Sequence, residues 1–230
     1  MLSNKPLSVH IKSRQRVRDL AEVYTNEREV TAMLNAAPEM FPNEADPSNT
    51  DRKFLEPACG SGNFLEAILR RKLAFVTPRR YGRGERYEHR ILRALASIYA
   101  IDIDMENVVE SRERLRAVIV SKIHYDLTTR QESKGFLDAI VVILATNIVC
   151  ADALKDAHLI RFVDYKAGRS GTFLREWSPY ITHDDLFAEL EVERDARSLH
   201  YSELSSNLLP VTALPETTAT ARTALGGTIA

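Results

Sequence analysis

The sequence predicts an α/β protein in which helices lie on both faces of a parallel sheet. Short apolar runs alternate along the chain with segments that repeat apolar residues at helical spacing, and this alternation is typical of parallel sheets. The stretch FLEPACGSGNFLEAIL, which begins at Phe54, places Gly60 and Gly62 between an apolar run and an amphipathic run. Acidic residues follow the predicted strands, at the edge where such sheets bind ligands.

The N-terminal part predicts an arm and one helix. Residues 1–19 are polar and basic, and we expect a flexible arm with a helical start. The pattern EREVTAMLNAA (27–37) places Val30, Met33 and Leu34 on one face of a short helix. Residues 38–51 are rich in Pro, Asn and Asp, which predicts a loop.

The first strand and the first core helix flank the two glycines. Phe54 and Leu55 open a short strand, and apolar residues recur at helical spacing from Phe64 to Leu73. A charged segment, TPRRYGRGERYEHR (77–90), follows. The next stretch, ILRALASIYAIDID (91–104), predicts a transition from a helix to a second strand.

The second half of the chain continues the alternation. MENVVESRERLRAVIVSKI (105–123) and RQESKGFLDAIVVILAT (130–146) predict helices, and NIVCAD (147–152) predicts a third strand. GTFLREWSPY (171–180) is a candidate fourth strand, and DDLFAELEVERDA (184–196) predicts a helix. From residue 205 onward Thr, Ala and Ser predominate, and we expect disorder. The predicted division is therefore 1–50 for the arm and helix, 51–204 for the core and 205–230 for the tail.

Composition excludes several classes of protein. The 230 residues carry a net charge of −1, with 44% hydrophobic and 27% charged residues, as in globular domains. No apolar run approaches the ~20 residues that span a bilayer, and the N-terminus lacks a signal-peptide core. We therefore expect a cytoplasmic protein with no membrane partner. Two cysteines exclude a disulfide framework, and neither they nor the six histidines show metal-site spacing, so no metal is expected.

Three acids at predicted strand ends indicate the kind of ligand. Glu56 adjoins the glycine loop, Asp102 ends the second strand and Asp152 ends the third. A carboxylate repels phosphate but accepts hydrogen bonds from ribose hydroxyls, which suits Asp102. Asp152 suits an adenine amino group, and Glu56 suits a cationic group. Adenine, ribose and a positively charged amino-acid tail together describe S-adenosylmethionine.

Four motifs resemble those of adenine-specific DNA methyltransferases of restriction–modification systems. FLEPACGSGNFL looks like their first motif, YAIDIDMENV like their second and NIVCADAL like their third. EVYTNEREV is similar to the motif that caps the methionine end of the cofactor, with Asn26 in place of its proline. The resemblance implies a Rossmann-like S-adenosylmethionine-dependent methyltransferase fold, and a truncated form of it is left open.

The resemblance also implies a role for each matched residue. Thr25 would contact the methionine carboxylate, and Asp102 would hold the ribose. Ile103 would pack against the adenine, and Asp152 would accept a hydrogen bond from the adenine amino group. The residues lining the methionine and sulfonium would be Glu56, Pro57, Ala58, Gly60 and Gly62.

The chain departs from the family in two ways. Gly60 and Asp102 are 102 − 60 = 42 residues apart, whereas the generic fingerprint expects about 20, so an inserted helix or loop is needed. The catalytic motif, a polar residue followed by Pro-Pro and an aromatic residue, is absent as such. Its nearest equivalent is REWSPY (175–180), in which Pro179 and Tyr180 match the last two positions. The first position is then either Trp177, which cannot accept a hydrogen bond, or, with one proline missing, Ser178 as the acceptor.

Each of these features also has a purely structural interpretation. Gly60 and Gly62 are compatible with a tight turn that binds nothing, and Asp102 and Asp152 with helix capping. Trp177 and Tyr180 are compatible with packing in a core or interface. One group is compatible either with phosphate contact or with a solvated surface diluted by neighbouring acids: Arg79, Arg80, Arg83, Arg86 and Arg90.

Three functional hypotheses follow. The first is a DNA adenine methyltransferase, or a modification-subunit fragment, that transfers a methyl group from S-adenosylmethionine to the amino group of a flipped adenine. The second is a non-catalytic S-adenosylmethionine-binding subunit of a restriction or phage-defence complex. A small-molecule methyltransferase is a third. We expect DNA as a partner and a protein that supplies target recognition or the catalytic motif, because few residues follow Tyr180; a homo-oligomer is left open.

Overall fold

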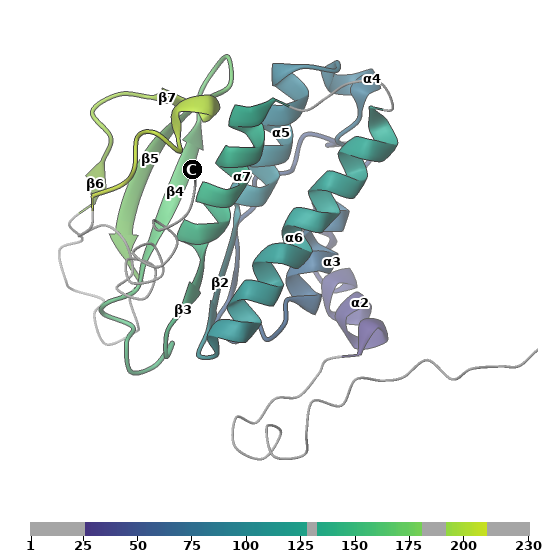
Figure 1. Cartoon of the computed structure of the whole chain (residues 1–230). Coiled ribbons are helices and arrows are strands. Elements are labelled where there is room, and N and C mark those ends of the chain that lie inside the picture. Colours follow the sequence, from purple (N-terminus) through teal and green to yellow (C-terminus); the bar gives the residue numbers. More distant parts are fainter. Residues whose placement is uncertain (1–25, 128–132, 181–191, 211–230) are drawn as a thin grey trace, which may run out of the picture.

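The computed structural model describes residues 26–127, 133–180 and 192–210, which form an α/β protein (Figure 1). Thr25, the predicted arm and most of the predicted tail lie outside these ranges. The helices are α2 (Glu27–Asn35), α3 (Asn63–Leu73), α4 (Pro78–Tyr81), α5 (Glu85–Ala96), α6 (Met105–Asp126) and α7 (Lys134–Asn147), with 3-10 turns η1 (Pro38–Met40) and η3 (Tyr201–Glu203). The strands are β1 (Phe54–Glu56), β2 (Ile98–Asp102), β3 (Ile148–Cys150), β4 (Arg161–Ala167), β5 (Thr172–Pro179), β6 (Glu193–Arg194) and β7 (Leu199–His200).

The predicted parallel sheet is present and has the strand order β1–β2–β3. Glu56 lies opposite Ala100, and Asp102 lies opposite Cys150. All five residues of β2 are buried, as its central position requires. Because the strands are parallel, their carboxyl ends meet at one edge of the sheet.

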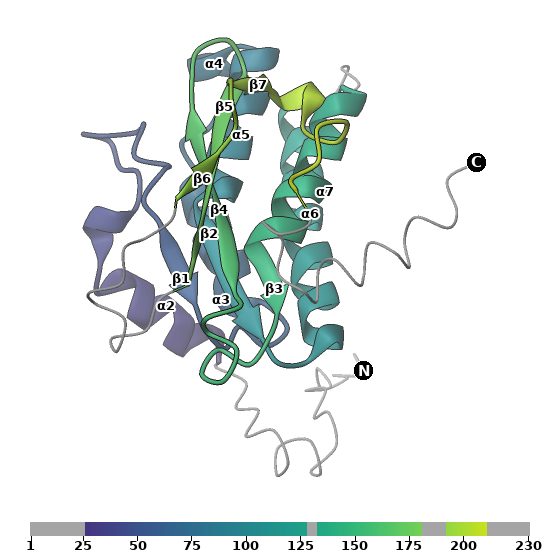
Figure 2. The same ribbon diagram turned by 90° about the vertical axis from the view of Figure 1, so that its left-hand side faces the viewer.

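Different structures cover the two faces of this sheet. Figure 1 shows α3 and α6 on one side of β2, and Figure 2 shows β4 in front of β2 on the other side. Side chains agree, since the rings of Tyr99 and Phe162 meet edge to face at 5.3 Å and Ile101 packs with Ile160. Helices on both faces, as predicted, are therefore not found in the described residues. Right-handed crossovers that proceed in one direction along a sheet place their helices on one side only.

The predicted fourth strand belongs to an antiparallel hairpin. β5 pairs with β4 from Arg161↔Pro179 to Ala167↔Phe173. The Gly168 amide closes the turn by donating to the Thr172 carbonyl (2.8 Å). Only a short turn separates the two strands, whereas a parallel neighbour needs a crossover of about a dozen residues or more.

The helix predicted over residues 184–196 is contradicted at its described end. Residues 184–191 lie outside the described ranges, but Glu193 and Arg194 form β6, which pairs with β5 opposite Trp177 and Glu176. Without β6, the backbone groups along this edge of β5 would have no strand partner. Their pairing with β6 accounts for a strand here in place of the predicted helix.

The long separation between Gly60 and Asp102 contains the inserted helices that the spacing required. α3, α4 and α5 all lie between β1 and β2. α5 begins inside the charged segment, and its inner face is formed by Tyr87, Ile91 and Leu92, which are fully buried. Within α5, Glu85 and Arg86 of this segment are therefore exposed, whereas Glu88 is buried.

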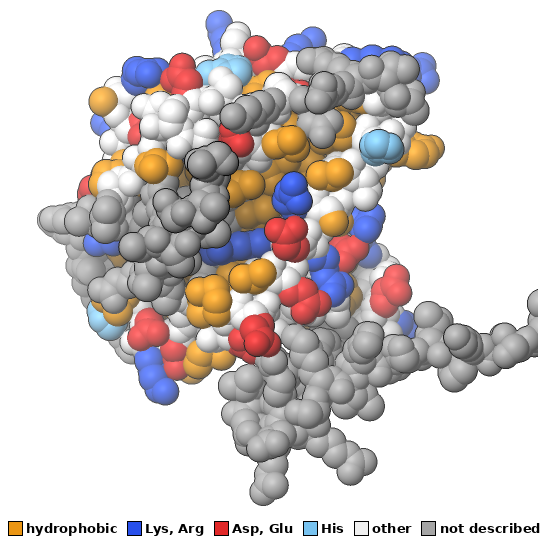
Figure 3. All heavy atoms as spheres, viewed as in Figure 1, with side chains coloured by type: hydrophobic (Ala, Val, Ile, Leu, Met, Phe, Trp, Pro, Cys, Tyr) orange, Lys and Arg blue, Asp and Glu red, His pale blue; other side chains and the backbone are white. Residues whose placement is uncertain are grey.

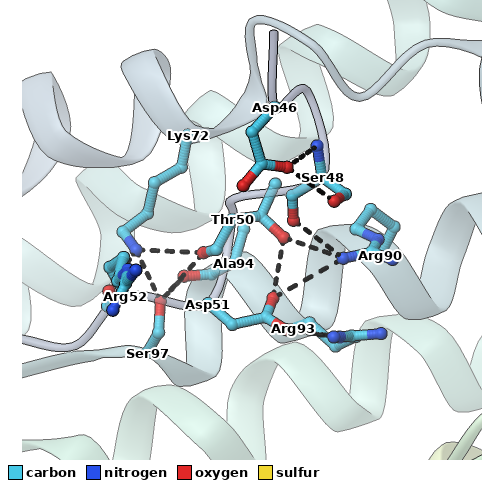
Figure 4. A network of polar contacts seen from close by, with 10 residues as sticks. All are labelled: Asp46, Ser48, Thr50, Asp51, Arg52, Lys72, Arg90, Arg93, Ala94 and Ser97. Carbon is cyan, nitrogen blue, oxygen red and sulfur yellow. Dashed lines mark hydrogen bonds and ion pairs between the residues drawn. The ribbon is translucent and has the colours of Figure 1, made fainter. Parts of the chain in front are cut away.

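A buried lysine fixes the segment that leads into β1 (Figure 4). Lys72 of α3 is fully buried, and its Nζ donates to the Thr50 carbonyl (3.0 Å), to the Arg52 carbonyl and to Ser97 Oγ (2.8 Å). Asp51, which lies between Thr50 and Arg52 in the sequence, forms ion pairs with Arg90 and Arg93 of α5. The start of β1 is thus tied to both α3 and α5.

The second sheet shares the main hydrophobic core with the helices. Phe173 is fully buried and Trp177 is 4% exposed, so core packing accounts for Trp177. Arg175, between them on the same face, holds Asp195 with two side-chain hydrogen bonds (2.8 and 2.9 Å). No helix within the described ranges is long and apolar enough to cross a membrane.

Candidate functional site

The loop between β1 and α3 lies against the end of β2. The Cys59 amide donates to the Ile101 carbonyl (3.0 Å), and the Gly62 amide donates to the Cys59 carbonyl (3.0 Å). Gly60 and Gly62 have φ values of 53° and 87°, which glycine adopts without strain. The chain therefore turns tightly at the carboxyl edge of the sheet before α3 begins.

The two glycines serve different purposes. A β-carbon at Gly62 would lie 2.8 Å from Ser111 Oγ, so this glycine allows α3 to pack closely against α6. A β-carbon at Gly60 would meet no atom within 4 Å. The tight-turn interpretation thus accounts for Gly62, whereas the space beside Gly60 is open to a ligand.

Asp102 holds the glycine loop directly. Its Oδ2 accepts from the Gly60 amide (2.7 Å), and its Oδ1 accepts from the Asp104 amide (2.9 Å) and from Asn107 Nδ2 (3.2 Å). The cap of α6 is Asp104, which accepts from the Glu106 amide (2.9 Å). Helix capping therefore belongs to Asp104, and Asp102 joins two segments that are far apart in the sequence. A carboxylate offers about four acceptor positions, and the described residues use three of those on Asp102.

Glu56 ends β1 at the same edge. It is half-buried, and its Oε1 accepts from the Ala58 amide (3.2 Å). Burial raises the pKa of Glu56 above its ordinary value, although the Ala58 bond opposes this. Pro57 and Ala58 beside it are exposed. A partly desolvated carboxylate is stabilised by a cation, so this position suits a positively charged group.

Asp152 caps the turn that follows β3. Its Oδ1 accepts from the amides of Lys155 and Leu154 (both 3.0 Å), and these bonds lower the pKa of Asp152. Its own amide donates to Asp156 Oδ2 (3.0 Å). The capping interpretation therefore accounts for the geometry of Asp152.

An apolar surface adjoins Asp102. Ile103 is 57% exposed and Met105 is 38% exposed, although both are large apolar side chains. The Ile103 carbonyl accepts from Cys150 Sγ (3.5 Å), which holds the end of β2 to the end of β3. Exposed apolar groups beside a few polar ones are typical of small-molecule sites.

Cys59 is a packing residue in this loop. It is 7% exposed, and its Sγ lies 3.7 Å from Ser111 Oγ. Burial raises the pKa of Cys59 to about 12. Because the thiolate is the nucleophilic form, this thiol is unreactive near neutral pH.

The candidate catalytic residues reach the same end of the molecule from the second sheet. Ser178 pairs with Phe162 across the hairpin, and Pro179 ends β5. The Tyr180 amide donates to the Ile160 carbonyl (2.7 Å), and the side chain packs on Ile101, Val149 and Ile160. The sequence predicted that these residues follow a fourth parallel strand, but β5 is antiparallel to β4. They nevertheless lie near the carboxyl ends of β2 and β3.

Two polar residues of α6 that the prediction missed support the loop. Asn107 donates to Asp102, and Ser111 Oγ donates to the Gly60 carbonyl (2.9 Å). Both are buried, at 2% and 0% exposure. Their signal in the sequence is a pair of polar residues four positions apart on the apolar face of an amphipathic helix.

A cavity of about 310 Å³ lies at the opposite edge of the parallel sheet, near the start of β2. Its cationic side chains are already paired: Lys53 with Asp164, Arg93 with Asp51 and Lys166 with Glu176. Tyr99 lines it as well. We assign it no ligand, because paired charges offer little to one.

The carboxyl edge of the parallel sheet is therefore where the predicted residues come together. The structure joins the glycine loop to Asp102 and places Ile103, Glu56 and Asp152 around them. Thr25 lies outside the described residues, so its place at this edge stays a prediction. A scan of family models and searches of curated proteins and of solved structures find no match to the chain.

Proposed function

We propose that the chain binds S-adenosylmethionine at the carboxyl edge of its parallel sheet and is the cofactor-binding core of a DNA adenine methyltransferase or of a modification subunit. The observation that carries the proposal is the meeting of Gly60 with Asp102 across 42 residues of sequence, beside open space. The strand order β1–β2–β3 is compatible with one half of a Rossmann-like sheet.

The residues at this edge fit the parts of the cofactor. Glu56 is a partly desolvated carboxylate for a cationic group, and the open backbone at Gly60 permits close approach. Within the described residues, Asp102 keeps one acceptor position for a hydroxyl, and Ile103 offers an apolar surface to a flat base. S-adenosylmethionine, when bound, supplies an electrophilic methyl group; the chain binds and orients it.

Ile103→Arg is expected to weaken S-adenosylmethionine binding about tenfold or more, because it replaces an apolar contact of the adenine by a charge. Isothermal titration calorimetry on the wild-type chain and the variant measures this. Val141→Arg is the matched control, since Val141 of α7 is 55% exposed and Ile103 is 57% exposed. No heat of binding with the wild type, or an equal loss in both variants, would refute the proposed site.

A second candidate function, a non-catalytic S-adenosylmethionine-binding subunit, is favoured by the position of REWSPY. Trp177 is buried in the core, and its neighbours Ser178 and Pro179 are held in an antiparallel strand. Methyl transfer needs an acceptor beside the target amino group and an aromatic side chain free to stack on the base. Tyr180 instead packs on an apolar cluster.

Ser178→Ala separates the two candidates. If the chain transfers the methyl group itself, this variant is expected to lower the initial rate of methyl incorporation into unmethylated DNA about a hundredfold, because the target amino group loses its acceptor. Radiolabelled S-adenosylmethionine gives the readout, with cofactor binding measured in parallel. Incorporation only in the presence of a second protein that carries the complete catalytic motif, and unchanged by Ser178→Ala, would assign catalysis to that partner.

A further inference from the structure

Four arginines gather at the end of the molecule opposite the glycine loop. We call Arg79, Arg80, Arg83 and Arg86 the arginine cluster; all four are exposed. They lie on α4, on the turn after it and on the first turn of α5. Figure 3 shows Lys and Arg side chains along the upper rim of the molecule, where Figure 1 places α4.

The positive charge of this cluster is not neutralised within the described part of the chain. The structure gives its four guanidinium groups no ion pair and no hydrogen bond there. The two acids of the same segment differ in exposure: Glu88 is 4% exposed and accepts from the Tyr201 hydroxyl (2.5 Å), whereas the Glu85 side chain is 47% exposed and lies 3.5 Å from His200 Nε2. Burial of Glu88 therefore leaves Glu85 as the one exposed acid of the described segment 77–90, beside four exposed arginines.

We propose that the arginine cluster binds the phosphodiester backbone of a nucleic acid, at a site separate from the carboxyl edge of the parallel sheet. Guanidinium groups are planar and bind phosphate oxygens in pairs, which distinguishes them from lysine. The segment 77–96 contains arginines and no lysine. Contacts of this kind position a protein on a nucleic acid without reading its sequence.

The surroundings of the arginine cluster favour a nucleic acid over a membrane surface. Between Leu55 and Ile103 the described chain exposes no large apolar side chain, whereas a helix that binds a membrane surface needs apolar side chains to insert into it. One exposed aromatic residue lies at this end: Tyr125 is 86% exposed, and Asp126 beside it accepts from the Tyr87 hydroxyl of α5 (2.5 Å). Basic groups beside an exposed aromatic ring are typical of nucleic-acid surfaces.

The arginine cluster and the carboxyl edge lie at opposite ends of α6. Its 22 residues run from Met105 at the edge to Asp126 at the cluster, which corresponds to about 33 Å. Nucleic-acid binding at the cluster therefore needs neither S-adenosylmethionine nor Asp102. This inference stands independently of the proposed function, and loss of either leaves the other intact.

The triple variant Arg79→Gln, Arg80→Gln, Arg83→Gln tests the proposal by fluorescence anisotropy with a short labelled DNA duplex and a salt series. We expect affinity to fall about tenfold or more and the slope of log K against log salt to drop by about 2 to 3, since each lost phosphate contact removes about 0.9. The matched control is Arg28→Gln, Arg52→Gln, Arg194→Gln, which removes three exposed arginines without ion pairs in the described chain. It should bind as the wild type does.

Further arms identify the partner. Single-stranded DNA and RNA share the backbone chemistry, and Tyr125→Ala should weaken single-stranded binding more than duplex binding if the ring stacks on bases. Polyglutamate and anionic vesicles are the competing polyanions. Equal loss in the triple variant and its control would overturn the proposal, as would wild-type binding that is insensitive to salt, or preference for polyglutamate or vesicles over every nucleic acid.

Discussion

Asp195→Ala is expected to lower the free energy of unfolding by about 3–5 kcal/mol, because it strands a buried guanidinium group. The side chain of Arg175 is 3% exposed, and that of Asp195 is 13% exposed. Asp195 accepts from Nε and Nη2 of Arg175 (2.8 and 2.9 Å) and from its backbone amide (3.2 Å). Nη1 of Arg175 is already buried without a partner in the described structure. Urea unfolding at neutral pH measures the loss.

A surface ion pair of the same segment provides the control. Arg197 and Glu203 lie 3.2 Å apart with side chains 66% and 42% exposed, so Glu203→Ala is expected to cost less than about 1 kcal/mol. The double variant Arg175→Met, Asp195→Leu is expected to recover most of the stability, since apolar residues replace the buried pair. Equal costs for Asp195→Ala and Glu203→Ala would contradict the prediction. The comparison also bears on the candidate catalytic residues, because Arg175 anchors the strand that carries Ser178 and Pro179.

The elements with strong periodicity could be predicted from the sequence, and those that depend on distant partners could not. The helix predicted over 105–123 is α6 (Met105–Asp126), and the three parallel strands lie where apolar runs end in acids. β4 escaped prediction because its alternation, with Val163 and Tyr165 inward, has meaning only beside β5. The sequence signal for the hairpin is GRSG (168–171) between two alternating runs. The strand at 171–180 was predicted from these residues, but the strand–helix alternation implied a parallel sheet, and β5 is antiparallel to β4.

The site shows a similar division. Glycines and acids at strand ends were sufficient to predict that the loop after β1 and Asp102 share one edge of the sheet, because parallel topology brings strand ends together. Their direct hydrogen bond was not predicted. What those acids bind locally was not predictable. Asp152 accepts from backbone amides of its own turn, and Asp102 accepts from the amides of Gly60 and Asp104, and such amides carry no residue-specific signal. Asp102 also accepts from the side chain of Asn107. The position of REWSPY in the fold could not be predicted from the sequence either, because it depends on the pairing of β5 with β4.

Lys72 is expected to make the free energy of unfolding depend strongly on pH. Burial lowers the pKa of Lys72 to about 7, even though nearby Asp51 opposes the shift. The pKa of a lysine in an unfolded chain is about 10.4. Between these two pKa values the Lys72 side chain is protonated in the unfolded chain and neutral in the folded chain. The free energy of unfolding therefore rises as the pH increases from about 7 to about 10. The slope for one proton is about 1.4 kcal/mol per pH unit, or about 2–3 kcal/mol from pH 7 to pH 9.

Lys72→Met removes this titration while keeping most of the volume of the side chain. The stability of the wild type relative to Lys72→Met, from urea unfolding at pH 7, 8 and 9, is therefore expected to increase with pH by about 1 kcal/mol per unit. Lys53→Met is the control, because Lys53 is 59% exposed in its pair with Asp164 and its removal should leave the pH dependence unchanged. A difference that is flat in pH would mean that the ammonium group stays charged. In that case the acceptors on Thr50, Arg52 and Ser97 outweigh the cost of burying it, and Lys72 acts as a charged anchor of the segment that leads into β1 and the glycine loop.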